Sequence, residues 1–157
     1  NGEEVDGDQI MAISALALKN NGKLTNNTLV GTVMSNLGLV KFCEANDINF
    51  VATKVGDRYV LEKMLDSNYM IGGEQSGHII FKEYANTGDG ELTSIQLLSL
   101  LKRSGKKLSE LASIMDKYER FVNSLILMKF LLDLSLYICY YIMAVREGRL
   151  NYISHSE

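Results

Sequence analysis

The chain has 157 residues, of which 46% are hydrophobic and 22% are charged, and its formal net charge is −3. This length and composition fit one ordinary globular domain with its own core. The weakly acidic balance offers no basic surface for a nucleic-acid partner. Cys43 and Cys139 lie far apart without metal-ligand spacing, so we expect a reducing, cytoplasmic setting.

The chain begins with Asn1 rather than methionine, and its first residues do not have the pattern of a signal peptide. We therefore expect an interior or processed piece of a longer protein.

Helix-like and strand-like patterns alternate along residues 8–118. Helices are expected over residues 8–20, 37–45, 57–66, 91–102 and 108–118. Strands are expected over residues 29–34, 48–53, 69–73 and 78–81. Asp6 or Asp8 can cap the first helix, and Asp89 can cap the helix over 91–102. The alternation predicts an α/β domain with a mostly parallel sheet.

Apolar spacing also predicts which face of the helix over 57–66 is buried. Residues 60, 61, 64 and 65 are apolar and are expected to face the sheet: Val60, Leu61, Met64 and Leu65.

Polar loops follow three of the expected strands, at residues 34–38, 54–58 and 73–78. Ligands of α/β sheets bind beyond the carboxyl ends of the strands, so we expect these loops to converge at one edge. In the first loop, Ser35 and Asn36 can line this edge or cap the next helix, and we expect the cap.

The most informative stretch is the third loop, Gly73-Glu74-Gln75-Ser76-Gly77-His78, which lies between two apolar runs. Glycines allow a tight turn and the close approach of a ligand. The carboxylate of Glu74 can accept two hydrogen bonds, and the hydroxyl of Ser76 can donate and accept. Two adjacent sugar hydroxyls would suit this pair. The alternative is a hairpin turn whose polar residues face water.

This loop resembles the sugar-binding loop of the α-D-phosphohexomutases, and the flanking sequence is most similar to the phosphoglucosamine mutase branch. Four further stretches agree in order and spacing: residues 5–11, 32–39, 53–60 and 87–90. The resemblance covers residues 1–118. It implies a three-layer α/β domain with a mixed, mostly parallel sheet. Residues 1–21 would end the family's second domain, and residues 22–118 would form the third, sugar-recognition domain.

The resemblance implies an enzyme of the isomerase class that interconverts glucosamine 6-phosphate and glucosamine 1-phosphate in cell-wall amino-sugar biosynthesis. This chain would supply its sugar-recognition part. Glu74 and Ser76 would bind neighbouring hydroxyls of the hexosamine phosphate, whereas His78 would either meet the substrate or brace the loop. The alternatives are a phosphomannomutase or phosphoglucomutase fragment and a non-catalytic sugar-phosphate-binding protein.

The loop at Gly56, Asp57 and Arg58 is a second expected substrate contact. It opens a helix, where backbone N–H groups and a cation suit an anion. The family has a substrate-contacting loop here. The alternative is that Asp57 caps the helix and Arg58 pairs with Glu62, four residues on.

Residues 6–8, Asp-Gly-Asp, match only the start of the family's magnesium loop. The third carboxylate and the arginine are replaced by Gln9-Ile10-Met11, so the octahedral oxygen set that magnesium prefers is missing. We therefore expect Asp6 and Asp8 to serve as turn and cap. Magnesium would serve the parent enzyme through ligands outside this chain.

Two more family elements have no counterpart in the sequence: the phosphoserine loop and a proline-containing phosphate loop. The chain contains no proline at all. The isolated chain is therefore expected to be inactive, and the family's other domains are its expected partners.

The family resemblance stops after Tyr118, and residues 119–157 are expected to be a non-family tail, which could be helical or could arise from a reading-frame change. Residues 121–145 are mainly apolar and long enough to span a bilayer. Lys129 and Asp133 would each cost about 2.5–3.5 kcal/mol near its centre. The length of the stretch favours a span and the two charges oppose it, so a membrane-anchored fragment is kept as a further alternative to a soluble fragment.

Overall fold

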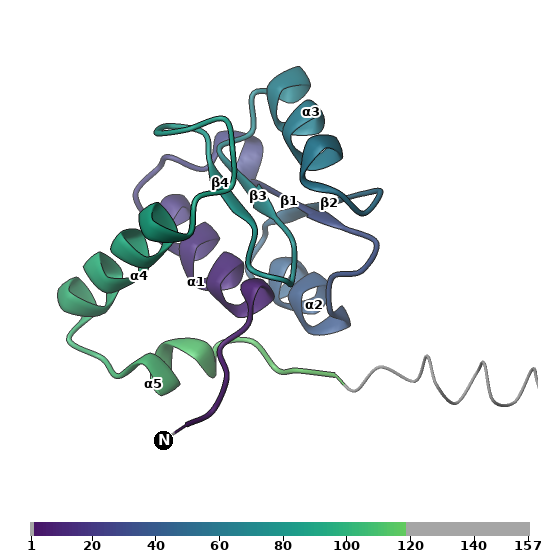
Figure 1. Cartoon of the computed structure of the whole chain (residues 1–157). Helices are drawn as coiled ribbons and strands as arrows, with labels where there is room; N and C mark the ends of the chain where they lie inside the picture. Colours follow the sequence, from purple (N-terminus) through teal and green to yellow (C-terminus); the bar gives the residue numbers. More distant parts are fainter. Residues whose placement is uncertain (1, 119–157) are drawn as a thin grey trace, which may run out of the picture. The chain divides into compact units, whose positions relative to one another are not determined.

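The structure, a computed structural model, describes residues 2–118 (Figure 1). Predictions for residues 119–157, including the apolar run 121–145, lie outside the described residues. Within residues 2–118, no helix combines the length and apolar character that a membrane crossing requires.

Five α-helices and four strands make up the regular structure of the described residues. The helices are α1 (Gly7–Asn20), α2 (Leu37–Ala45), α3 (Asp57–Ser67), α4 (Gly90–Ser104) and α5 (Leu108–Ala112), with a short 3-10 helix η1 (Thr25–Asn27). The strands are β1 (Thr28–Thr32), β2 (Asn49–Thr53), β3 (Ile71–Gly73) and β4 (Ile79–Phe81). Their order in the sheet is β2-β1-β3-β4. β1 is parallel to β2 and β3, and β4 is antiparallel to β3, which confirms the predicted mixed sheet.

Side chains that alternate along the strands build a core on each face of the sheet. Leu29 belongs to the larger core with residues of α1 and α2, and its neighbour Val30 belongs to the smaller core. This smaller core holds Val60 and Met64 of α3. Since successive strand residues point to opposite faces, the result is a three-layer arrangement. Figure 1 shows α3 on one side of the strands and α1 and α2 on the other.

Helix starts follow the predicted caps. The Asp6 carboxylate accepts a hydrogen bond from the backbone N–H of Gln9 (3.1 Å), and the Gln9 side chain accepts one from the N–H of Asp6 (3.3 Å). This reciprocal pair is a capping box that fixes the start of α1. Asn36 caps α2 and Asp89 caps α4, both as expected.

Two local predictions were wrong. The last helix ends at Ala112 instead of residue 118. There the Gln9 side-chain amide donates a hydrogen bond to the Ala112 carbonyl (3.2 Å). Beyond this contact the chain leaves the helical path. In α3, Leu65 is 48% exposed while Met64 is fully buried. A helix turns by roughly 100° per residue, so Leu65 lies away from the sheet.

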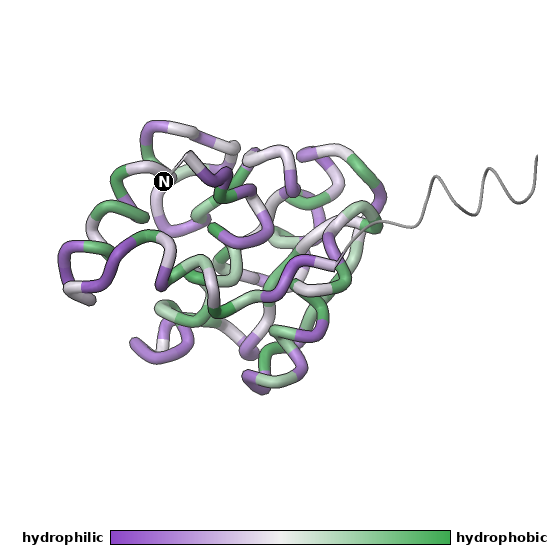
Figure 2. The backbone as a smooth tube through the Cα atoms, turned by 90° about the horizontal axis from the view of Figure 1, so that it is seen from below, coloured by the Kyte–Doolittle hydropathy of each residue, from purple (hydrophilic) through white to green (hydrophobic). Residues whose placement is uncertain are grey.

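Hydropathy follows the same layering. Figure 2 shows hydrophobic and hydrophilic residues alternating along the helical stretches of the backbone, as expected where one side of a helix packs inward.

Candidate functional site

Two of the three polar loops meet at the carboxyl edge of the sheet. β1, β2 and β3 are parallel, so their carboxyl ends share one edge. There the backbone N–H of Gly56 donates to Glu74 Oε1 at 2.9 Å, which joins loop 54–58 to loop 73–78. The predicted convergence of these two loops is confirmed.

The start of α1 links the remaining loop, 34–38, to the same edge. The backbone N–H of Asn36 donates to Asp8 Oδ2 at 2.6 Å, and the N–H of Gly7 donates to the Gln75 carbonyl at 2.9 Å. The carboxylate of Asp8 is fully buried. Consecutive residues of α1 thus hold two loops together, and Asp8 binds a loop instead of capping a helix.

Loop 73–78 is a tight turn closed by two backbone hydrogen bonds. The Glu74 N–H donates to the His78 carbonyl and the Gly77 N–H to the Glu74 carbonyl, both at 3.0 Å. Glu74 is half-buried, and Ser76 is exposed near the tip of the turn. The backbone therefore fixes an oriented carboxylate two residues from an accessible hydroxyl.

His78 faces the neighbouring loop from the end of the turn. Its Nε2 lies 3.7 Å from Asp57 Oδ2, and both side chains are about half exposed. The ring also lies against the backbone of Gly88, where an added Cβ would be 2.9 Å from Nε2. Both roles considered for His78, contact with the substrate and support of the loop, are thus compatible with its position. Its ring reaches the edge of the site near Asp57 and packs against Gly88.

Gly56, Asp57 and Arg58 lie where the sequence placed them, at the start of α3. Gly56 is the N-cap position, and its φ of +127° is a conformation that favours glycine. Asp57 is therefore not the cap, because it is already the first helical residue. Its carboxylate accepts from the Arg58 N–H at 2.7 Å.

The Arg58 guanidinium points along the helix toward Glu62 rather than toward loop 73–78. Its Nε lies 2.8 Å from Glu62 Oε1, and both side chains are largely exposed. The hydrogen bond to Glu62 raises the pKa of Arg58. An arginine side chain is a cation at physiological pH in any case. Such an exposed pair is weak and can be exchanged for another anion.

Lys117 is a residue of this region that sequence reasoning missed. Its Nζ lies 3.1 Å from Asp6 Oδ2. It lines a hollow of about 380 Å³ together with Glu4, Asp6, Gln75 and Ser76. Some forty residues separate Lys117 from the turn, and no local motif marks it, so only the fold reveals the proximity.

The carboxylates near the start of α1 do not fit a magnesium site. Asp6 is used by the cap of α1 and by Lys117, and Asp8 by the N–H of Asn36. Among residues 2–118, no group of three or more His, Cys, Asp or Glu side chains is placed to hold a metal ion.

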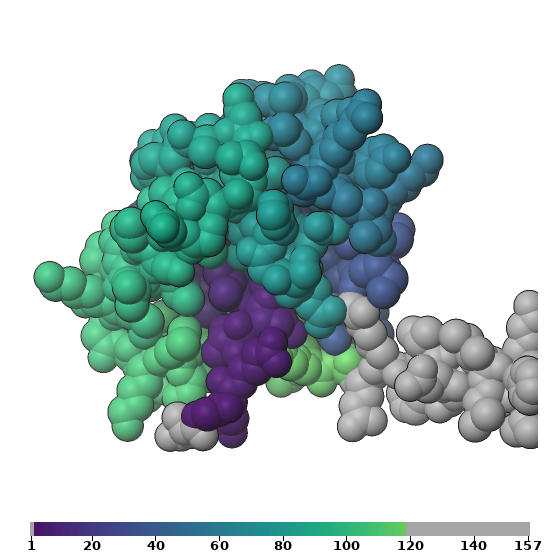
Figure 3. All heavy atoms as spheres, viewed as in Figure 1, coloured from purple at the N-terminus to yellow at the C-terminus, as the bar shows by residue number. Residues whose placement is uncertain are grey.

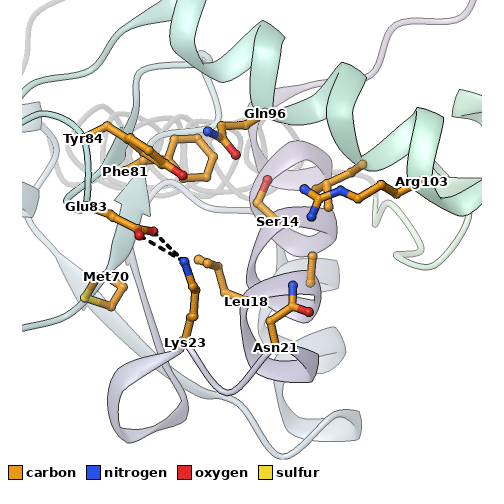
Figure 4. A pocket seen from close by; sticks show the side chains of 12 residues that line it. Ser14, Leu18, Asn21, Lys23, Met70, Phe81, Glu83, Tyr84, Gln96 and Arg103 are labelled. Atoms are coloured by element: carbon orange, nitrogen blue, oxygen red, sulfur yellow. Dashed lines mark hydrogen bonds and ion pairs between the residues drawn. The ribbon is translucent and has the colours of Figure 1, made fainter.

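A second hollow of about 360 Å³ lies at the opposite edge of the sheet (Figure 4). Its lining includes Phe81, which pairs with the first residue of β3 and so marks the amino edge of the parallel strands. Lys23 and Glu83 form an ion pair on one side (3.0 Å), and Ser14 and Arg103 lie on the other. This hollow is separate from the carboxyl-edge loops.

A three-layer α/β/α domain with polar loops at the carboxyl edge of a mixed sheet defines the class of this protein. A family model described as phosphoglucomutase/phosphomannomutase, alpha/beta/alpha domain III, matches residues 6–118. The chain belongs to this family. The matched stretch includes α1, and the proposed division between residues 21 and 22 stays a prediction.

Curated relatives carry the comparison further. The chain is 68% identical over 116 residues to a phosphoglucosamine mutase of Acetivibrio thermocellus, which covers 74% of this chain and 26% of the relative. It is 58% identical over 122 residues to a phosphoglucosamine mutase of Brevibacillus brevis, which covers 78% and 27%. The chain thus spans about a quarter of the length of these relatives.

Solved structures agree on the fold. A putative phosphomannomutase from Thermus thermophilus superposes with a TM-score of 0.64 at 28% identity, covering 69% of this chain and 24% of that one. An N-acetylphosphoglucosamine mutase from Aspergillus fumigatus, in complex with GlcNAc-6P and magnesium, has a TM-score of 0.56 at 18% identity, covering 72% and 30%.

Proposed function

We propose that this chain is the sugar-recognition domain of a phosphoglucosamine mutase, which interconverts glucosamine 6-phosphate and glucosamine 1-phosphate. The observation that carries the proposal is the hydrogen bond from Gly56 to Glu74. It sets the carboxylate of the Gly-Glu-Gln-Ser-Gly-His turn against the loop that opens α3. The 68% identity to a phosphoglucosamine mutase favours this substrate over the mannose and glucose phosphates of other family members.

The chemistry of the turn suits a hexose with neighbouring hydroxyls. The bond from Gly56 orients the Glu74 carboxylate, whose remaining lone pairs accept from sugar hydroxyls. Ser76, exposed on the same turn, adds a donor and acceptor. Because adjacent hydroxyls occupy similar places when the sugar phosphate is reversed, the same two side chains can read both orientations.

The start of α3 is the proposed phosphate contact in this chain. Backbone N–H groups at a helix N-terminus attract anions. Arg58 would exchange its exposed partner Glu62 for the substrate phosphate, and His78 faces Asp57 at the same edge. Phosphoryl transfer depends mainly on such positioning and on charge neutralisation. The phosphoserine and the magnesium ion would come from other parts of the parent enzyme, in a cytoplasmic setting.

Exposed apolar side chains beside these loops support a second contact surface. Five of them come from the loops and helix starts that follow β1 and β2, and each is 43–68% exposed: Val33, Met34, Leu37, Val55 and Tyr59. Exposed apolar groups gathered in one region commonly mark interaction surfaces. We propose that the remaining family domains cover them, and that the isolated chain has no mutase turnover.

A chimeric enzyme tests the proposal. The 116-residue stretch of the Acetivibrio thermocellus phosphoglucosamine mutase would be replaced by the matching residues of this chain. The chimera is expected to convert glucosamine 6-phosphate. Glu74→Ala in the chimera is expected to lower kcat/KM by about 100-fold or more, since an oriented charged hydrogen-bond partner of the substrate is lost.

The matched control is Lys63→Met, which removes the surface pair of Lys63 and Asp66 on α3, away from the turn. It should leave turnover unchanged. An inactive chimera that nevertheless folds, or an active one that tolerates Glu74→Ala, would contradict the proposed function.

A further inference from the structure

The two ends of the described domain meet at the candidate sugar-binding turn. In Figure 3 the purple N-terminal segment lies beside both the bright-green end of the domain and a teal segment from the middle of the chain. The contacts that join them centre on Asp6. Its Oδ1 caps α1 by accepting from the Gln9 N–H, and its Oδ2 accepts from Gln75 Nε2 at 3.3 Å.

Lys117 completes this network. Its ammonium lies 3.1 Å from Asp6 Oδ2 and also donates to the Glu4 carbonyl at 3.3 Å. The Asp6 side chain is only 13% exposed. A carboxylate so shielded from water interacts more strongly with a cation than a surface carboxylate does, and loses more when the cation is removed.

The backbone packs closely where the two ends of the domain meet the loops of the carboxyl edge. A Cβ on Gly7 would lie only 2.7 Å from the Gln75 carbonyl oxygen and from the Gly77 nitrogen, so no side chain fits there. A Cβ on Gly38 would likewise collide with the Asp116 carbonyl oxygen. Both glycines let a chain end lie directly against a loop of the carboxyl edge.

A second set of hydrogen bonds joins the trailing segment, residues 117 and 118, to loop 34–38. Asn36 Nδ2 donates to the Tyr118 carbonyl at 2.9 Å, and the Tyr118 N–H donates to Asn36 Oδ1 at 3.0 Å. Residues 117 and 118 therefore contact the start of α1 and the cap of α2 at once. Displacement of residues 117 and 118 would therefore disturb both the start of α1 and the cap of α2.

We propose that Lys117 is a positioning residue for the sugar-binding turn. It holds Asp6, Asp6 holds Gln75, and Gln75 lies between Glu74 and Ser76. Through this chain of contacts the trailing segment holds in place the turn that carries the two sugar-binding side chains, and a movement of that segment changes sugar affinity. The inference rests on the proposed function for its sugar ligand, whereas the coupling itself is a property of the free protein.

Amide hydrogen exchange in the full 157-residue chain, followed by NMR without ligand, tests the coupling. Lys117→Met is expected to speed exchange roughly tenfold at the amides of Gly7 and Gly77, which bond to the turn. Amides of α3 should be unaffected. Lys117→Arg keeps the charge and should restore slow exchange. Lys63→Met, the surface-pair control, should change neither amide.

Asp6→Asn provides a second variant, because asparagine still caps α1 but carries no charge. Its effect at Gly7 and Gly77 should match that of Lys117→Met, and the double variant should be no worse than either single one. Unchanged exchange at these two amides in Lys117→Met, or an equal rise throughout the domain, would overturn the proposal.

Titration with glucosamine 6-phosphate then measures the consequence for binding. Lys117→Met should weaken the affinity about tenfold, and Lys117→Arg should recover it. Equal affinity in Lys117→Met and the parent chain would overturn the link to sugar binding. If the parent chain shows no binding at all, the proposed function fails, but the exchange experiment still decides whether Lys117 positions the turn.

Discussion

Glu74 serves the fold and the proposed substrate at the same time. One of its oxygens accepts from Gly56, and this hydrogen bond links the two loops directly. A sequence can indicate that a carboxylate between glycines is suited to sugar hydroxyls, but it cannot show that a backbone amide 18 residues away orients it. The orientation follows from the parallel arrangement of β2, β1 and β3.

Cys43 is a residue whose chemical reactivity is lowered by its burial in the fold. It is fully buried in the larger core, and burial raises the pKa of its thiol to about 12. The thiolate is the reactive form. In a Cys139→Ser background, a thiol reagent at about pH 8 is therefore expected to label Cys43 only when the chain unfolds. Labelling of the native chain as fast as of the urea-unfolded chain would contradict this.

The same shift sets a pH dependence of stability. The pKa of Cys43 is raised in the folded state, so the unfolded chain loses this proton first as the pH rises. The free energy of unfolding should be unaffected by this group below about pH 9 and should fall between about pH 9 and about pH 12. Denaturation by urea across this range should show a smaller decline in Cys43→Ala than in the parent chain.

Individual elements show where sequence patterns are reliable and where they are not. The starts of α1, α2 and α4 were predictable, because each cap depends on a polar side chain next to the helix. The end of α5 was not predictable. Its last carbonyl accepts from Gln9, 103 residues earlier in the chain, and apolar spacing carries no record of that contact.

Helix α3 offers a matched pair of variants at this scale. Met64 is fully buried against Val30 and Ile80 of the sheet, and its neighbour Leu65 is 48% exposed. Met64→Ala is expected to lower the free energy of unfolding by about 2–5 kcal/mol, because it leaves a cavity. Leu65→Ala should change it by only about 0.5 kcal/mol. Urea denaturation of both variants measures the difference, and equal losses would place α3 in a different rotation about its axis.

The whole domain is a platform for loops that lie far apart in the sequence. Sequence reasoning predicted the α/β class, the mixed sheet and the meeting of loops 54–58 and 73–78, since parallel strands bring their carboxyl ends to one edge. It did not find Lys117, because the proximity of residue 117 to residue 6 is a product of the closed fold. Apolar side chains are exposed at the same edge. This chain spans only about a quarter of the length of its relatives, so we expect such side chains to be covered by the other domains in a full-length enzyme.

The measurement that most directly tests the central claim is an NMR titration of the ¹⁵N-labelled chain with glucosamine 6-phosphate. Glucosamine and inorganic phosphate serve as separate controls. We predict weak, saturable shifts of the amides of Gly56, Glu74, Ser76 and His78, larger than with either control and absent in Glu74→Ala. Shifts confined to the hollow around Lys23 and Arg103, or no shifts at any concentration reached, would contradict the account.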